Sequence, residues 1–123
     1  MNIGAPEGAR EVLGAERART RARLAALERD FDGIVEAGAS AATDDEHDPE
    51  GGTTAFERQH VAALIGQARD HLADIARALE RLAEGRYGQC ERCGRAIAPE
   101  RLAARPAAST CITCAAGGQI PGR

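Results

Sequence analysis

The residues of this chain whose type and spacing could do chemistry are its four cysteines. They form two CxxC pairs, Cys90 with Cys93 and Cys111 with Cys114, and 17 residues separate the pairs. Each pair can present two thiolates to one side of a tetrahedral ion, which makes this spacing typical of a zinc site. Because protein sulfur fills all four positions and none remains for water, we expect one structural Zn²⁺ and no catalytic metal.

The segment around the cysteines needs a metal in order to fold. Residues 86–114 contain only four sizeable apolar side chains: Tyr87, Ile97, Leu102 and Ile112. Burying them cannot offset an ordering cost of about 1–2 kcal/mol per residue. Zinc binding supplies roughly 10–16 kcal/mol at such sites, which is enough to fold a small finger.

Other uses of the cysteines are less well supported. Paired disulfides suit an exported protein, and the N-terminus shows no secretory signal. A redox CxxC normally lies between a strand and a helix, a context that this sequence lacks. Iron remains an alternative, because it can occupy the same four thiolates.

Charge is unevenly distributed along the chain. Residues 1–85 carry a net charge of −7, and residues 86–123 carry +4. One Zn²⁺ with four thiolates has a formal charge of about −2, so we expect part of the basic excess to offset the metal site. The candidates are the arginines in or beside the cysteine loop: Arg86, Arg92, Arg95, Arg101 and Arg105.

The residues before the cysteines form two amphipathic helical segments. The first, residues 7–37, places four apolar side chains on one face at spacings of 3, 4 and 3: Leu24, Leu27, Phe31 and Ile34. This stripe is weaker before Leu24, where Arg17 and Thr20 occupy the matching positions.

The second helical segment carries a longer apolar stripe. Seven residues follow one another at alternating spacings of 4 and 3: Val61, Ile65, Ala68, Leu72, Ile75, Leu79 and Leu82. We expect this helix to begin at Thr54, because Thr54 and Glu57 can form a capping box. Gly85 is well placed to end it.

Two such helices should pack as a long antiparallel coiled-coil hairpin. The expected fold class is therefore mainly α, a hairpin followed by a small C4 zinc finger. Pro49 and the glycine pair 51–52 predict a connection at about residues 38–53. In the alternative arrangement the second helix pairs with another chain, but the first helix offers it a matching stripe, so we expect a monomer.

Four segments make up the predicted organisation of the chain. They are a flexible N-terminus at 1–6, the hairpin at 7–85, the finger at 86–115 and a flexible tail at 116–123. Within the finger we expect a short helical turn after Pro99, since proline is well tolerated at the first helical position.

The predicted connection is strongly acidic. No arginine or lysine lies between Arg29 and Arg58, and this interval holds nine Asp and Glu residues, most densely from Asp44 to Glu50. A thin hairpin with a negative end suits insertion into a narrow channel, where carboxylates meet basic side chains or a metal ion. The alternative is a solvated polar loop, the commoner role of a charge run.

A longer pattern surrounds the cysteines. It reads Tyr87-Gly88-x-Cys90-x-x-Cys93-Gly94, then Ile97, then Arg101-Leu102-x-Ala104-Arg105-Pro106-x-Ala108, then Cys111-x-x-Cys114. This pattern resembles the DksA/TraR C4-type zinc-finger family. The preceding hairpin also fits that family, so the resemblance covers about residues 24–115.

The resemblance implies a transcription regulator that binds RNA polymerase. Members of the family insert the hairpin into the secondary channel, without binding promoter DNA sequence-specifically, and several act with the alarmone ppGpp, a candidate partner here. Their tip motif, D-x-x-D-x-A, implies Asp45, Asp48 and Glu50 as partner-binding residues, with Glu50 where Ala is expected. A second register begins at Asp48 and places Gly51 where the second aspartate would be.

Other functional classes fit the sequence less well. We expect no enzyme, because we find no Ser/His/Asp arrangement, phosphate-cradling glycine loop or open metal position. A zinc-ribbon nucleic-acid-binding module is the alternative; the basic finger favours it, and the acidic remainder and scarce aromatics oppose it. No apolar run approaches the ~20 residues that span a bilayer, so we expect a cytoplasmic protein without a membrane partner.

Overall fold

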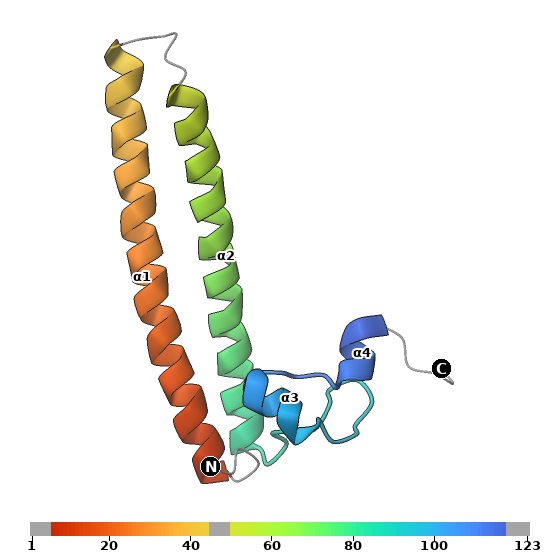
Figure 1. Ribbon diagram of the computed structural model, residues 1–123. Coiled ribbons are helices and arrows are strands. Elements are labelled where there is room, and N and C mark those ends of the chain that lie inside the picture. The colour runs from red at the N-terminus through yellow and green to blue at the C-terminus, as the bar shows by residue number, and fades with distance from the viewer. Residues whose placement is uncertain (1–5, 45–49, 118–123) are drawn as a thin grey trace. The chain divides into compact units, whose positions relative to one another are not determined.

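The structure is a computed structural model that describes residues 6–44 and 50–117, with side chains for residues 8–39 and 54–117. The described residues form four helices: α1 (Pro6–Asp44), α2 (Glu50–Ala83), α3 (Pro99–Ala104) and α4 (Ile112–Gly117). The long helices α1 and α2 run antiparallel, and the cysteine-bearing segment follows α2 (Figure 1). The described part of the chain contains no strand, only an isolated bridge between Gln89 and Ala96. The predicted fold class is confirmed.

Both long helices extend further toward the connection than the sequence predicted. Helix α1 runs to Asp44, and α2 begins at Glu50. The predicted capping box is therefore wrong, because Thr54 lies inside α2, and its Cγ2 atom is 3.4 Å from where a Cβ would stand on Gly38 of α1.

The cause lies in local helix propensity. The alanine-rich run 39–42 favours helix and offsets the cost of Gly38. The glycine pair 51–52 falls in the first turn of α2, where the N–H groups need no intrahelical partner. Helix therefore occupies much of the interval predicted as connection.

The described residues divide into two compact units, and the division cuts across both long helices. One unit, Arg19–Asp70, contains helical residues of α1 and α2, and we call it the helix unit. The other, Met1–Ala18 with His71–Arg123, contains the remaining parts of both helices and the cysteines, and we call it the finger unit.

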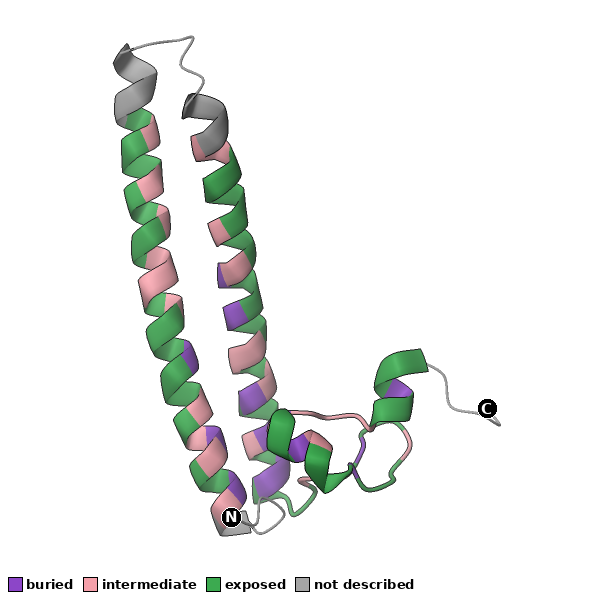
Figure 2. Cartoon of the chain, viewed as in Figure 1, coloured by how far each residue is buried: buried purple, intermediate pink, exposed green. Residues whose placement is uncertain are grey.

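In the helix unit, the predicted stripe residues are buried or half-buried (Figure 2). Thr20 of α1, at a position where the stripe was expected to weaken, is also buried, with 8% of its surface exposed. Ile65 and Ala68 of α2 are buried, with 8% and 4% of their surface exposed. The stripe of α1 is half-buried: Leu24, Leu27, Phe31 and Ile34. An exposed ion pair also joins the helices, with Arg69 Nη2 3.0 Å from Glu28 Oε2. Apolar packing rather than this ion pair stabilises the unit, because exposed pairs contribute little.

In the finger unit, both helices and the finger share one apolar core. Its buried members are Ala9 and Leu13 of α1, Ile75, Ala78 and Leu82 of α2, and Ala107 of the finger. The stripe of α1, expected to weaken before Leu24, is thus continued by two buried residues. The finger contributes to the same core through Ala107, so it is packed against the helices of this unit.

Gly85 ends α2 as predicted. Its φ of 77° is the left-handed conformation that glycine adopts without steric cost. The N–H of Gly85 donates to the Leu82 carbonyl at 3.2 Å, and the N–H of Arg86 donates to the Arg81 carbonyl at 2.8 Å. These two bonds define a Schellman motif, which satisfies carbonyls at the helix end and turns the chain into the finger.

The long helices are built from alanine and charged residues more than from large apolar ones. None of the described helices is long and apolar enough to cross a membrane.

Three glycines of the long helices have open surroundings, since a Cβ on Gly14, Gly33 or Gly66 would meet no atom within 4 Å. No close approach requires glycine at these three positions.

The core of the finger unit predicts a large effect of one truncation. Leu13 is fully buried, so Leu13→Ala should lower the free energy of unfolding by about 2–5 kcal/mol through lost burial and a cavity. Urea unfolding followed by circular dichroism measures this loss. Val35→Ala on the same helix, where Val35 is 40% exposed, is the control and should cost less than about 1 kcal/mol. Equal losses in both variants would contradict the assigned core.

Candidate metal centre

Four sulfur atoms converge in the finger. The Sγ atoms of Cys90, Cys93, Cys111 and Cys114 all lie within 4.8 Å of one another, and those of Cys93 and Cys111 are 3.7 Å apart. All four are free thiols. Sulfurs placed about 2.3 Å from one tetrahedral zinc ion lie about 3.8 Å from each other. The donor set and its spacing therefore fit one zinc ion.

The site is closed by protein ligands. Cys90 and Cys114 are buried, and Cys93 and Cys111 are half-buried. Among the described residues, no His, Asp or Glu joins the four sulfurs as a further ligand. Four sulfur ligands complete a tetrahedron, so the zinc they hold is structural, as the sequence predicted.

A tight turn positions the first cysteine pair. The N–H of Cys90 donates to the Arg95 carbonyl at 2.8 Å, and the N–H of Gly94 donates to the Cys90 carbonyl at 2.9 Å. Gly94 has a φ of 77°, a left-handed conformation that glycine adopts without steric cost, so glycine suits this position of the turn. The bonded turn brings Cys90 and Cys93 to the same side of the site.

Two short helices position the second cysteine pair. Pro99 begins α3 as predicted, and Arg101 of this helix donates from Nε to the Thr110 carbonyl at 2.8 Å. That bond fixes the residue before Cys111. Cys114 lies in α4, where the N–H of Ala115 donates to the Cys111 carbonyl at 2.9 Å. The spacing of the second pair thus follows from one helical turn.

A small apolar core supports the sulfurs. Ile97 and Leu102 are buried beside Cys90 and Cys114. Ile112 is 69% exposed and takes no part in this core. The core is therefore even smaller than the count of apolar residues suggested, which strengthens the need for the metal.

Tyr87 joins the finger to the helices of its unit. Its side chain packs against the small apolar core beside the sulfurs and against the core that the finger shares with α1 and α2. Its hydroxyl donates to the Pro106 carbonyl at 2.7 Å. Burial raises the pKa of the Tyr87 hydroxyl, and the positive charge of Arg81 partly opposes this rise. Tyr87 therefore serves packing and is not free to stack on a ligand.

The thiols of Cys90, Cys111 and Cys114 differ in their pKa. Burial raises the pKa of Cys90, but hydrogen bonds from the backbone of Cys111, Cys93 and Arg92 outweigh it and bring the pKa to about 6. Hydrogen bonding from the Cys114 backbone lowers the pKa of Cys111. Burial, together with the neighbouring sulfurs, raises the pKa of Cys114 to about 12. Zinc binding must therefore displace at least the Cys114 proton.

Two of the finger's arginines contact groups other than the sulfur atoms. Arg86 forms an ion pair with Glu84, and Arg101 is bonded to the Thr110 carbonyl. Backbone N–H groups, rather than these two guanidinium groups, stabilise the Cys90 thiolate. These contacts do not test the expectation that some of the finger's arginines offset the charge of the sulfur site, so it stays a prediction.

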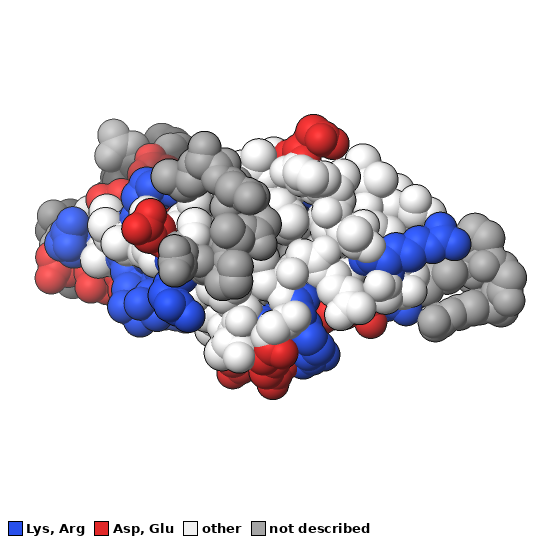
Figure 3. All heavy atoms as spheres, turned by 90° about the horizontal axis from the view of Figure 1, so that it is seen from below, with Lys and Arg blue, Asp and Glu red and all other residues white. Residues whose placement is uncertain are grey.

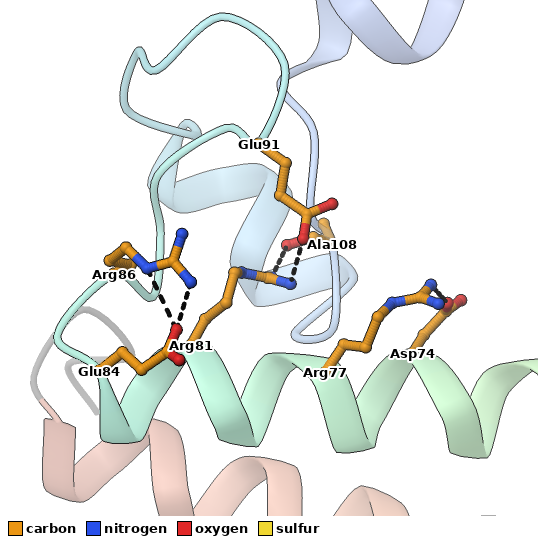
Figure 4. Close-up of polar contacts among 7 residues, drawn as sticks. All are labelled: Asp74, Arg77, Arg81, Glu84, Arg86, Glu91 and Ala108. Carbon is orange, nitrogen blue, oxygen red and sulfur yellow. Dashed lines mark hydrogen bonds and ion pairs between the residues drawn. The ribbon is translucent and has the colours of Figure 1, made fainter.

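Arg81 is the residue whose position the sequence analysis missed. An arginine between the stripe residues Leu79 and Leu82 would be expected to face solvent, but only 4% of Arg81 is exposed. Its side chain points from α2 into the finger, where it meets Glu91 and Ala108 (Figure 4). The available signal was Ala78, a small residue three positions earlier that is also buried and widens the apolar stripe on this side.

The predicted tip residues cannot be placed. Asp45 and Asp48 lie outside the described residues, and Glu50 is the first residue of α2, with its side chain not described. Among acidic residues whose side chains are described, the nearest to them in sequence are exposed: Glu36 on α1 and Glu57 on α2. The tip assignment remains a prediction.

Comparison with protein families matches the finger. Residues 85–117 match the family model described as the prokaryotic dksA/traR C4-type zinc finger. This match contains all four cysteines and confirms the resemblance inferred from the sequence.

Comparison with individual proteins finds two relatives that match part of the chain. The chain is 41% identical over 66 residues to the uncharacterized protein YteA of Bacillus subtilis (strain 168), covering 54% of this chain and 28% of YteA. It is 48% identical over 44 residues to an uncharacterized protein of Aquifex aeolicus (strain VF5), covering 36% of this chain and 30% of that protein. The matches thus span less than a third of either relative.

A solved structure resembles most of the chain. The transcription factor DksA2 from Pseudomonas aeruginosa superimposes with a TM-score of 0.72 and 26% sequence identity, covering 89% of this chain and 79% of DksA2. The likeness therefore includes the long helices as well as the finger.

Because all four ligands are cysteines, replacing a single cysteine should abolish metal binding. Cys114→Ser should reduce bound zinc from one ion per chain to near zero, because serine does not supply a thiolate. Elemental analysis of protein purified under reducing conditions measures the ratio. Thr113→Ala, which alters the exposed neighbour, is the control and should keep one ion. Full zinc content in Cys114→Ser would contradict the four-sulfur site.

The thiol pKa values predict the direction of pH dependence. Protons compete with zinc for the sulfurs, so zinc affinity falls as the pH falls. Each proton displaced on binding should weaken the apparent affinity about tenfold per pH unit. Zinc release between pH 8 and pH 5, measured with a chromogenic chelator, checks this. An affinity that is unchanged or higher at pH 5 would contradict it.

Proposed function

We propose, from a DksA/TraR-type C4 zinc finger that follows a DksA2-like pair of helices, that this protein is a transcription regulator acting on RNA polymerase. The likeness to DksA2 over 89% of the chain carries the proposal, because that protein is described as a transcription factor. The finger match at residues 85–117 supports it independently. Polymerase as the partner follows from the family resemblance.

The proposed mechanism is insertion of the hairpin end into the secondary channel of the polymerase. The interval from Arg29 to Arg58 has nine acidic residues and no arginine or lysine within it. Such an end is attracted to basic groups or a metal ion inside a channel. We propose Asp45, Asp48 and Glu50 as the contacting residues, with ppGpp as a co-regulator of the same complex.

The zinc ion has a structural part in this proposal. It holds the finger together against the helices of its own unit and provides no open coordination position. The protein would thus change the activity of another enzyme rather than catalyse a reaction itself. We propose that it acts in the cytoplasm, where the polymerase is found. We also propose that it acts as a monomer.

The alternative, a nucleic-acid-binding zinc ribbon, has one observation in its favour. Residues 86–123 carry a net charge of +4. However, on the face seen in Figure 3 arginines and acidic side chains are interspersed, without a continuous basic surface. Tyr87, the aromatic residue of the finger, is engaged in packing. Both features weaken the alternative, because such modules need a basic track and stacking surfaces.

The proposal predicts retention of purified RNA polymerase by the immobilised, zinc-loaded full chain. Asp45→Ala/Asp48→Ala should lose its effect on transcription in vitro, while retention falls by at most about tenfold, because charges at the edge of an interface change the association rate more than the affinity. Glu11→Ala/Asp70→Ala, which removes two exposed acidic residues at other positions of the helices, is the charge-matched control and should behave as wild type. No retention of polymerase by wild type would refute the proposal.

A DNA-binding titration distinguishes the alternative. Affinity for duplex or single-stranded DNA that falls steeply with salt is the behaviour of a nucleic-acid-binding module. The proposal expects no measurable binding to either at physiological salt. Tight, salt-sensitive binding together with failure to retain polymerase would replace the proposal by the alternative.

A further inference from the structure

A buried arginine connects α2 to both halves of the finger. Arg81 donates from Nη1 to Glu91 Oε1 at 3.2 Å and from Nη2 to the Ala108 carbonyl at 3.3 Å (Figure 4). Glu91 directly follows the ligand Cys90, and Ala108 lies three residues before the ligand Cys111. One guanidinium group therefore contacts the chain beside the first cysteine pair and the chain leading to the second.

The two contacted segments are also joined to each other. The N–H of Glu91 donates to the Ser109 carbonyl at 2.8 Å. Arg81, Glu91 and the 108–109 segment thus form a closed hydrogen-bonded arrangement at the point where the cysteine pairs meet. We call this arrangement the Arg81 junction.

A buried cation at this position is costly unless its partners are in place. Arg81 is 4% exposed, and among the described residues its Nε atom has no hydrogen-bond partner. Desolvating a guanidinium is unfavourable, and an apolar side chain in its place would pack at lower cost. Arg81 is favourable only where a carboxylate and a carbonyl meet its two terminal nitrogens.

Those partners depend on the fold of the finger. Between them lie Ile97 and Leu102, the buried apolar residues of the finger core, which are too few to order the loop. The four sulfurs must therefore be drawn together by the metal before Glu91 and Ala108 stand at their observed separation. Without metal, Arg81 would remain a cation at an apolar helix end.

We propose that Arg81 makes docking of the finger on α2 conditional on zinc: the arginine bonds the finger only when the metal holds both cysteine pairs together. Because coupling between two sites is reciprocal, the Arg81 junction also slows the loss of zinc. Arg81 is a positioning residue, because its guanidinium bonds Glu91 and Ala108 and not a sulfur atom. This inference holds whether or not RNA polymerase is the partner.

Arg77 provides a matched control four residues earlier on the same helix. Its side chain is 58% exposed, and its guanidinium forms an ion pair with Asp74 of α2 itself, not with the finger (Figure 4). Arg77→Met and Arg81→Met make the same chemical change on the same helix. They differ in whether the lost group contacts the finger.

The first measurement is zinc release from the full chain into excess chelator. Arg81→Met should still bind one zinc ion but release it about tenfold faster, as expected for loss of a group that supports metal ligands from outside. Arg77→Met should release zinc at the wild-type rate. Glu91→Gln probes the same contact from the finger side, and its effect should not add to that of Arg81→Met. An unchanged release rate in Arg81→Met, or additive effects, would overturn the proposal.

The second measurement separates positioning from general stability. Urea midpoints of wild type and Arg81→Met are compared with zinc and again after the metal is removed. The variant should unfold at lower urea than wild type only in the zinc form. An equal shift in both forms would mean that Arg81 is merely structural and would overturn the conditional role. Should Arg81→Met not fold, Arg81→Lys and Glu91→Gln are compared in the same way, with the same two outcomes.

Discussion

The structure of the finger depends on four thiolates being held by one metal ion. With Ile97, Leu102 and Ala107 as its buried apolar residues outside the ligands, this segment has too little hydrophobic burial to offset its ordering entropy. The turn at Gly94, the helix at Pro99 and the turn of α4 each fix a few residues, but none brings Cys90 near Cys111. Metal coordination supplies that long-range contact, and the local hydrogen bonds then determine its geometry.

The sequence predicted those features that depend on local chemistry. The cysteine spacing indicated the zinc site, Gly85 indicated the end of α2, and the heptad stripe from Val61 to Leu82 identified the buried face. The glycine and the stripe depend on residues close together in sequence whose conformations are dictated by sterics or by period, and the cysteine spacing depends on the ligand preference of zinc. The conformations that these local patterns predict are retained in the fold because tertiary contacts favour the same conformations.

The features that sequence reasoning missed depend on contacts between distant segments. Thr54 has the sequence pattern of a helix cap, but it lies inside α2 and against Gly38, a contact between two helices. Arg81 reads as a surface charge from its own helix, because Glu91 and Ala108 lie 10 and 27 positions away. Neither contact produces a periodic pattern in the sequence. The acidic residues Asp45, Glu46 and Asp48 lie outside the described residues, and their role is a proposal.

Three glycines of the long helices leave room for change. Gly14, Gly33 and Gly66 have open space where a side chain would begin, and each costs roughly 1 kcal/mol relative to alanine within a helix. The two helices therefore hold about 3 kcal/mol less intrinsic stability than their backbone geometry allows. Replacement of these glycines during evolution would stiffen the helices without disturbing a neighbour, so rigidity in this protein is adjustable independently of the metal site.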